Sequence, residues 1–238
     1  MTSFLRRKDW RFLVEKYALR KHPEFEPDVR RVLKSLSGNL AVDIGANMGV
    51  HTRLLAKRFK TVYAIEPNPK ALSILYPRVP RNVRVIEVAL SDHIGTAVFY
   101  TDPHPVTTSP ADTILPTFKY NPSPSRKGWP SGVAHTYHGE KGLEVETTTY
   151  DAVLKGMHAD LVLIDVEGAE FLVLEGMKKS IAGGKVKTLL VELHDVDRRR
   201  ELEDRLSAYR VKWIDLDHLF ATTENGFPAS SQSIRLRG

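Results

Sequence analysis

The sequence predicts an α/β fold: a mostly parallel, seven-stranded sheet of the Rossmann-like type, with helices on both faces and a helical addition at the N-terminus. First, apolar runs of strand length alternate from Leu40 onward with segments of helical periodicity, which is typical of such sheets. Second, one of these runs passes directly into a glycine turn. Third, 238 residues suffice for one domain with a sizeable core, so we expect residues 1–238 to form a single domain.

The first 37 residues are expected to form a helical cap. Residues 4–21 carry apolar side chains at approximately helical spacing among charges. A second helix is expected over 27–36, because Pro27 suits a first helical turn and Gly38 follows the last one. Both segments precede the first core strand, so we expect them to pack on the sheet. Contact of the first helix with a membrane surface is the alternative.

The core elements follow in alternation. Strands are expected at 40–44, 61–65, 83–89, 160–165 and 186–192, and helices at 50–58, 69–76, 170–180 and 197–209. Added strands are expected at 95–101 and 143–149, and an antiparallel hairpin of 212–216 with 232–237 is expected to close the sheet. Residues 102–142 show no period and are dominated by Pro, Ser, Gly, Thr and His, which predicts a loop-rich insertion that could serve as a substrate lid.

The composition excludes several classes of protein. The chain has no cysteine, which excludes disulfides, cysteine-bound zinc and a thiol nucleophile. No apolar run reaches the roughly 18 residues of a membrane span, and Met1–Trp10 lacks the apolar core of a signal peptide, so a soluble, cytoplasmic protein is expected. The net charge of +6 favours anionic partners such as nucleic acid, although scattered basic clusters are most often solvated surface.

The glycine turn predicts a ligand site. A buried strand carries Asp43 near its end and continues into Gly45-Ala46-Asn47-Met48-Gly49, where glycine permits close approach of the backbone to a small molecule. Roughly 20 residues after Asp43, the next strand ends on Glu66, where a Rossmann-like site places a carboxylate for ribose hydroxyls. Together, these features indicate a cofactor that contains a nucleoside.

The turn differs from the dinucleotide fingerprint G-x-G-x-x-G, and Asp43, two residues before it, would repel a phosphate. S-adenosylmethionine (SAM) has no phosphate and carries a cationic amino group and a sulfonium, so an acidic entrance suits it. A strand, turn and helix without a ligand is the alternative, and Glu66 at the expected spacing favours the SAM site.

A second set of polar residues follows later strands. Ligands bind beyond the carboxyl ends of strands in open α/β sheets, and Asp43, Glu66, Asp165 and His194 all stand at such ends. Glu167 and Glu170 lie close behind Asp165, with a glycine between them. An acid near a helix start often only favours the helix dipole, which could suffice for Glu170 but explains Asp165 less well.

The chain resembles the FkbM-type SAM-dependent methyltransferases between about residues 40 and 195. The matching segments are VDIGANMGVHT, AIEPNP, NVRVIEVALSD, LIDVEGAEFLVLEGM and LLVELH, in this order. The resemblance implies that Asp43, Gly45, Asn47 and Gly49 line the methionine end of SAM, that Glu66 holds the ribose, and that Ala89 and Leu90 lie near adenine. It also implies that Asp165, Glu167 and His194 face the transferred methyl, with Asp165 contacting the cofactor as well.

The resemblance further implies transfer of a methyl group from SAM to a hydroxyl of a sugar or other small molecule. An alcohol needs a general base or a metal to lose its proton, and His194 is the leading base candidate because imidazole titrates near neutral pH. A divalent cation such as Mg²⁺, held by Asp165 with Glu167, His194 or Asp195, is compatible with these residues without being required.

Two other functions remain open. The basic charge favours methylation of an RNA ribose 2′-hydroxyl, in which Lys34 and Asp165 could fill two places of a Lys-Asp-Lys-Glu tetrad, although His194 stands where its second lysine is expected. A binding module without activity is the third reading, and the intact acids at both expected sites disfavour it.

Overall fold

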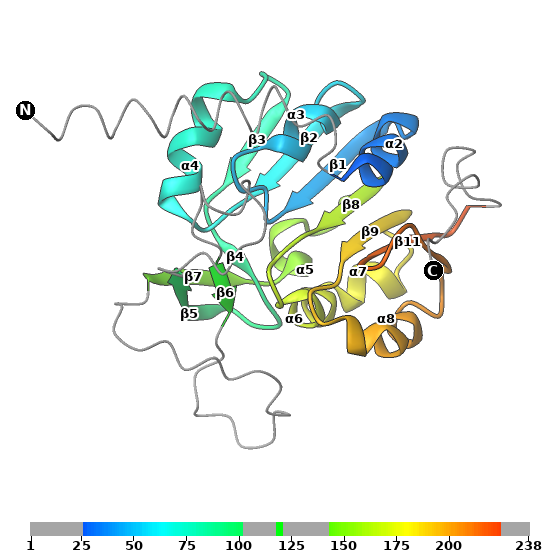
Figure 1. The fold of residues 1–238 in the computed structure, drawn as a ribbon. Coiled ribbons are helices and arrows are strands. Elements are labelled where there is room, and N and C mark those ends of the chain that lie inside the picture. Colours follow the sequence, from blue (N-terminus) through cyan, green and yellow to red (C-terminus); the bar gives the residue numbers. More distant parts are fainter. Residues whose placement is uncertain (1–25, 102–117, 121–142, 225–238) are drawn as a thin grey trace, which may run out of the picture.

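A seven-stranded sheet forms the centre of the computed structural model, which describes residues 26–101, 118–120 and 143–224 (Figure 1). The strand order is β10-β11-β9-β8-β1-β2-β3. The strands are β1 (Gly38–Ile44), β2 (Phe59–Ile65), β3 (Val83–Ile86), β8 (Leu161–Ile164), β9 (Thr188–Glu192), β10 (Arg210–Trp213) and β11 (His218–Thr222). β1, β2, β3, β8 and β9 pair in parallel, whereas β11 runs antiparallel to β9 and β10 antiparallel to β11. The predicted mostly parallel, seven-stranded sheet is confirmed.

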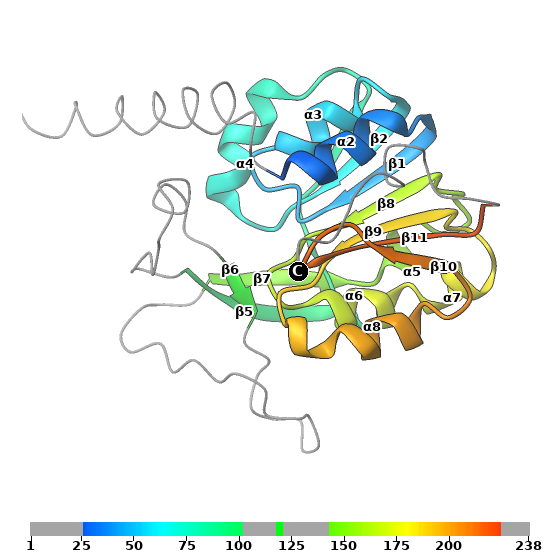
Figure 2. The same ribbon diagram turned by 45° about the vertical axis from the view of Figure 1, so that its right-hand side comes forward.

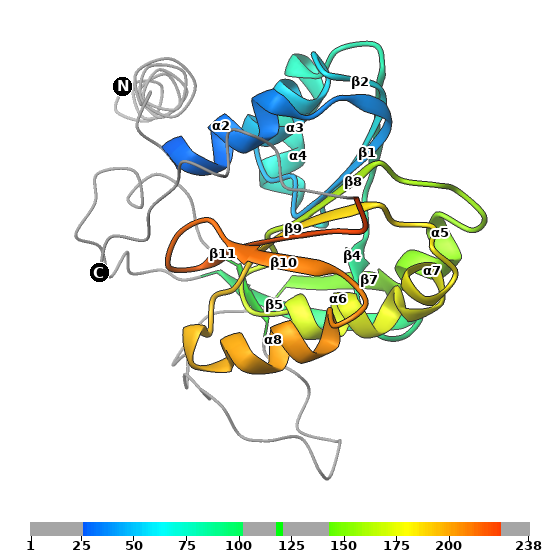
Figure 3. The same cartoon turned by 90° about the vertical axis from the view of Figure 1, so that its right-hand side faces the viewer.

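Helices cover both faces of this sheet (Figure 3). One face carries α2 (Pro27–Ser35), α3 (Val50–Leu55) and α4 (Pro69–Leu75), with a short 3₁₀ helix, η2 (Tyr76–Arg78), after α4. The other face carries α5 (Tyr150–Val153), α6 (Glu170–Gly176), α7 (Lys178–Ala182) and α8 (Arg199–Arg205), the last preceded by η3 (Val196–Arg198). In the described ranges, we find no helix with the length and apolar character that crossing a bilayer requires.

The alternation of side chains along β1 explains why both faces are covered. Val42 and Ile44 pack with α6 and α8 in one apolar cluster, whereas Ala41 packs with α2 and Leu55 of α3 in a second. Successive side chains of a strand point to opposite faces, so an uninterrupted apolar run must be buried on both. Packing on both faces therefore fixes these core strands and keeps their carboxyl ends aligned.

A smaller sheet with the order β4-β7-β5-β6 lies on the side of α5 and α6 (Figure 2). Its strands are β4 (Ala89–Leu90), β5 (Gly95–Thr101), β6 (Phe118–Tyr120) and β7 (Leu143–Thr148). The two added strands expected at 95–101 and 143–149 are thus present and pair with each other. β6 is a strand inside the segment for which the sequence predicted only loop, and it pairs with β5.

Other expectations need correction. The antiparallel hairpin that closes the sheet is formed by β10 (Arg210–Trp213) and β11 (His218–Thr222). β11 also pairs with β9, and all five of its residues are buried. The helix expected over 170–180 is two helices that divide near Gly176, where a side chain would meet the Ser91 carbonyl. The helix expected at 4–21, the strand at 232–237 and most of the proposed lid lie outside the described residues.

Candidate active site

The carboxyl ends of four neighbouring strands lie at one level. Ile44, Ile65, Ile164 and Val191 are linked in register across β2, β1, β8 and β9. The next residue on each strand therefore lies at the same edge of the sheet: Gly45, Glu66, Asp165 and Glu192. The sequence predicted three of these four and did not single out Glu192.

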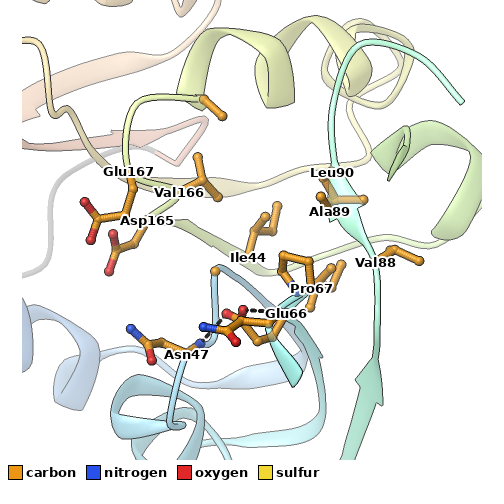
Figure 4. Close-up of a pocket in the computed structure, with 14 residues that line it drawn as sticks. Ile44, Asn47, Glu66, Pro67, Val88, Ala89, Leu90, Asp165, Val166 and Glu167 are labelled. Carbon is orange, nitrogen blue, oxygen red and sulfur yellow. Dashed lines mark hydrogen bonds between the residues drawn. The ribbon is translucent and has the colours of Figure 1, made fainter. Parts of the chain in front are cut away.

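A cavity opens along this edge and encloses about 670 Å³, the open space at its mouth included. It is lined by Ile44, Gly45, Asn47, Ile65, Glu66, Pro67, Asn68, Val88, Ala89, Leu90, Asp165, Val166, Glu167 and Ala169. Asp165 and Glu167 lie at one end, the segment Val88–Leu90 lies at the other, and Glu66 lies between them (Figure 4). The cavity thus has an acidic end, a carboxylate in the middle and an apolar end.

Glu66 is held by the backbone on both of its oxygens. Its Oε2 accepts a hydrogen bond of 2.8 Å from the Asn47 backbone N–H, and its Oε1 accepts one of 2.7 Å from Asn68. The side chain is buried, and burial raises the pKa of Glu66 to about 7 despite these two bonds. A carboxylate oxygen has lone pairs for more than one donor, so hydroxyls of a ligand in the cavity can add to these bonds.

The glycine turn is shaped by contact between two loops. Gly45 has φ +83°, and a Cβ at this position would lie 1.7 Å from the Asp165 carbonyl oxygen. Only glycine lets the loop after β1 approach the loop after β8 this closely. Asn47 and Gly49 also have positive φ values of 49° and 82°. Gly49 is the N-cap of α3.

Asp43 is buried and does not line the cavity. Its carboxylate is buried and accepts a hydrogen bond from the Thr52 hydroxyl of α3. Burial raises the pKa of Asp43 above its usual range. Gly49 is not among the lining residues either, and the bond from Thr52 to Asp43 joins the end of β1 to α3.

At the acidic end, the loop after β8 changes direction abruptly. Glu167 has φ 52° and Gly168 has φ 101°, two successive left-handed residues that start the turn into α6. Glu170 follows, is almost completely buried, and accepts a hydrogen bond from the Gly168 backbone N–H. Glu170 is therefore not a surface acid: it lies in the first turn of α6, and its carboxylate also holds this loop.

His194 lies among four carboxylates. Its Nδ1 is 2.9 Å from Glu170 Oε1 and its Nε2 is 3.2 Å from Glu167 Oε2. The Nε2 atom is also 4.0 Å from Asp165 and 3.7 Å from Glu192. Although burial opposes its charge, hydrogen bonds to Glu167 and Glu170 raise the pKa of His194 to about 11. The imidazole therefore keeps both protons near neutral pH, unlike the titrating base that the sequence suggested.

Burial and the nearby Glu192 raise the pKa of Asp165 well above its usual range, although the charge of His194 opposes this. Asp165 is thus a stronger proton acceptor than an ordinary surface carboxylate. Of the predicted cofactor residues, the cavity brings together Gly45, Asn47, Glu66, Ala89, Leu90 and Asp165. The sequence missed the apolar lining from Val88 and Pro67, whose only signal is their position next to predicted site residues.

The mostly parallel sheet, with a cavity at its carboxyl edge, defines a Rossmann-like fold. The model of the methyltransferase FkbM domain family matches residues 43–221. The chain belongs to the FkbM methyltransferase family. A search of curated proteins found no match.

The comparison with solved structures found similar chains. The methyltransferase FkbM from Methylobacillus flagellatus KT is 15% identical with a TM-score of 0.50, and the match covers 84% of this chain and 50% of that one. The present chain thus spans half the length of this relative. A precorrin-6y C5,15-methyltransferase from Geobacter metallireducens GS-15 is 14% identical, with a TM-score of 0.45 and 83% and 79% of the two chains covered. An rRNA methylase from Streptococcus thermophilus is 13% identical, with a TM-score of 0.43 and coverages of 85% and 96%.

Proposed function

We propose that this protein is a SAM-dependent O-methyltransferase that acts on a hydroxyl of a sugar or another small molecule. The observation that carries the proposal is one continuous cavity that joins the buried Glu66 to the acidic end formed by Asp165 and Glu167. The membership of the FkbM family supports methyl transfer, and the cavity supports the positions of the two substrates.

The residues of the cavity fit SAM in three places. Glu66 can accept hydrogen bonds from ribose hydroxyls while its two backbone donors hold it in position. Val88, Ala89 and Leu90 offer an apolar surface to a flat base. The acidic end suits the positive charge of the amino group and sulfonium. Bound SAM supplies a methyl carbon that its positive sulfur already activates.

The protein then has to align the acceptor and remove its proton. The acceptor oxygen forms a bond to the methyl carbon as the carbon–sulfur bond breaks, and the hydroxyl proton passes to a carboxylate. We assign this base to Asp165, because its pKa is raised and it lines the cavity. His194, charged and bonded to Glu167 and Glu170, keeps the acidic loop in place and limits repulsion among its carboxylates.

The same residues also fit a divalent cation such as Mg²⁺. One ligand atom from each of Asp165, Glu167 and His194 lies within 4.8 Å of the others. A bound cation would lower the pKa of the acceptor hydroxyl and would require His194 to release a proton. Turnover that a chelator abolishes and Mg²⁺ restores would favour this variant, whereas unchanged turnover would favour Asp165 as the base.

RNA ribose is the alternative acceptor. Lys34 lies exposed in the last turn of α2, and the residues that line the cavity in the described chain include no lysine. The described residues therefore do not assemble the tetrad expected for 2′-O-methylation, and the basic net charge remains its main support.

The test is methyl transfer from labelled SAM to a panel of sugars, other small alcohols and short RNAs. With an accepted substrate, Asp165→Asn should reduce turnover about 100- to 10,000-fold. The Kd for SAM should rise far less, because one charge of the acidic end is lost while the Glu66 end is intact. Glu146→Gln on the exposed face of β7 is the matched control. Full turnover by Asp165→Asn would remove Asp165 from the mechanism, and SAM binding without any turnover on the panel would favour a binding module.

A further inference from the structure

A second group of acids and a histidine lies at the same edge of the sheet, outside the cavity. β11 pairs antiparallel with β9 so that His218, its first residue, is directly opposite Glu192, the last residue of β9. Glu26, the N-cap of α2, approaches them in a left-handed backbone conformation with φ 45°. None of Glu26, Glu192 and His218 lines the cavity described above.

The three side chains present their polar atoms to one point. His218 Nε2 is 3.5 Å from Glu192 Oε2 and 3.9 Å from Glu26 Oε2, and one atom from each residue lies within 4.8 Å of the others. Bonds of about 2.1 Å from one ion separate neighbouring ligand atoms by about 3.0 to 3.5 Å and opposite ones by about 4.2 Å. The observed separations are long for hydrogen bonds but agree with ligands around a common cation.

The orientation of His218 supports this geometry. Its Nδ1 is 2.9 Å from Asp215 Oδ1 and 2.9 Å from Asp217 Oδ1. Asp215 is itself fixed, because it accepts a hydrogen bond from the His218 backbone N–H. A carboxylate on one ring nitrogen is the usual support of a metal-binding histidine, since it leaves the lone pair of the other nitrogen for the ion.

The acids of this group have only imidazoles as partners among the described residues. Glu26 Oε2 is buried and lies 3.1 Å from His51 Nε2. In the described chain, the groups that form ion pairs with Glu26 and Glu192 are imidazoles, from His51, His194 and His218. Burial opposes the charge of His218, but hydrogen bonds to Asp215, Asp217 and Glu192 raise its pKa well above the usual range. A divalent cation would therefore replace the proton on His218 Nε2 and would compensate both carboxylates at once.

We propose that Glu26, Glu192 and His218 form a binding site for a divalent transition-metal ion. Two carboxylates and one imidazole suit Mn²⁺ or Zn²⁺ better than Ca²⁺, which prefers oxygen ligands alone. The ion joins the start of α2 to the ends of β9 and β11. Because Glu192 Oε1 is 3.7 Å from His194 Nε2, the ion also fixes a carboxylate that borders the proposed catalytic residues.

The full chain, first freed of metals with a chelator, is titrated with Mn²⁺ without SAM or acceptor, and free Mn²⁺ is followed by electron paramagnetic resonance. We expect saturable binding in which Glu26→Gln and His218→Gln each weaken the affinity at least 10-fold. His158→Gln, at an exposed histidine, is the control. Glu26→Gln keeps the proposal testable if His218→Gln does not fold, as judged by circular dichroism.

Glu167→Gln distinguishes this site from the possible Mg²⁺ site at Asp165, Glu167 and His194. Binding that persists in Glu167→Gln and weakens in Glu26→Gln supports the second site, whatever the outcome of the turnover assays. No saturable binding below 1 mM (about −4 kcal/mol), or binding that only Glu167→Gln weakens, would overturn it.

Discussion

Both ends of the cavity contain carboxylates, but these carboxylates are stabilised in different ways. At the middle and apolar end, Glu66 is a single carboxylate that receives one backbone N–H on each oxygen. At the acidic end, Asp165, Glu167 and the buried Glu170 surround one imidazole, His194, and Glu192 lies beside it. The first arrangement is complete before a ligand arrives and suits the unchanging nucleoside. The second has excess negative charge, and its protonation can change when a cation, a sulfonium or an acceptor enters.

The largest effect on stability and SAM binding is expected at Gly45, because the loops of the two ends of the cavity meet there. Gly45→Ala places a methyl group against the Asp165 carbonyl oxygen, which is backbone and cannot easily move. We expect the free energy of unfolding in urea to fall by about 2–4 kcal/mol and SAM binding to be lost. Gly184→Ala is the control, since it has φ +63° with no atom within 4 Å of the added carbon and should cost only about 1–2 kcal/mol. Equal losses in the two variants would show that the contact with Asp165 is unimportant.

A smaller effect, confined to the nucleoside end, is expected for Glu66→Gln. The NH₂ of the new amide would face one of the two backbone N–H donors and lose that hydrogen bond. The neutral amide would also accept weaker hydrogen bonds from the ribose hydroxyls than the carboxylate does. Calorimetry should show SAM affinity reduced about 10- to 100-fold. Turnover at saturating SAM should change far less than in Asp165→Asn. If Glu66→Gln instead lowered turnover and left SAM affinity intact, the functions assigned to the two ends would have to be exchanged.

The smallest and most gradual effect is on pH dependence. The pKa of Glu66 is raised to about 7, so its charged form is disfavoured by folding. Its contribution to stability is present below the unfolded-state pKa of about 4.5 and is lost as the pH rises to about 7.

SAM affinity should change with pH in the opposite direction, because ribose hydroxyls bond best to the charged carboxylate. We expect affinity to fall as the pH decreases below about 7, by up to tenfold per pH unit. Calorimetry between pH 5.5 and 8.5 measures this, with Glu66→Gln as the variant that should lack the dependence. A wild-type affinity that is constant over this range would contradict the role of Glu66.

The nucleoside end could be predicted from the sequence because its signals are local. The strand, the glycine turn and the second acid follow one another along the chain. The carboxyl ends of parallel strands lie at one edge of the sheet, so residues at these ends can be expected to meet. The charge state of His194 could not be predicted, because it depends on Glu170, whose burial follows from the left-handed turn at Glu167 and Gly168. The position of His218 directly opposite Glu192 could not be predicted either, since it depends on the antiparallel register of β11 with β9. All residues of β11 are buried, so its sequence has no alternation of polar and apolar residues that would indicate this register.

The most direct test of this account is a crystal structure of the protein with S-adenosylhomocysteine bound. We expect ribose hydroxyls within hydrogen-bonding distance of Glu66, adenine against Val88–Leu90, and the sulfur directed toward Asp165. A nucleoside in the reverse orientation, or bound outside this cavity, would contradict it.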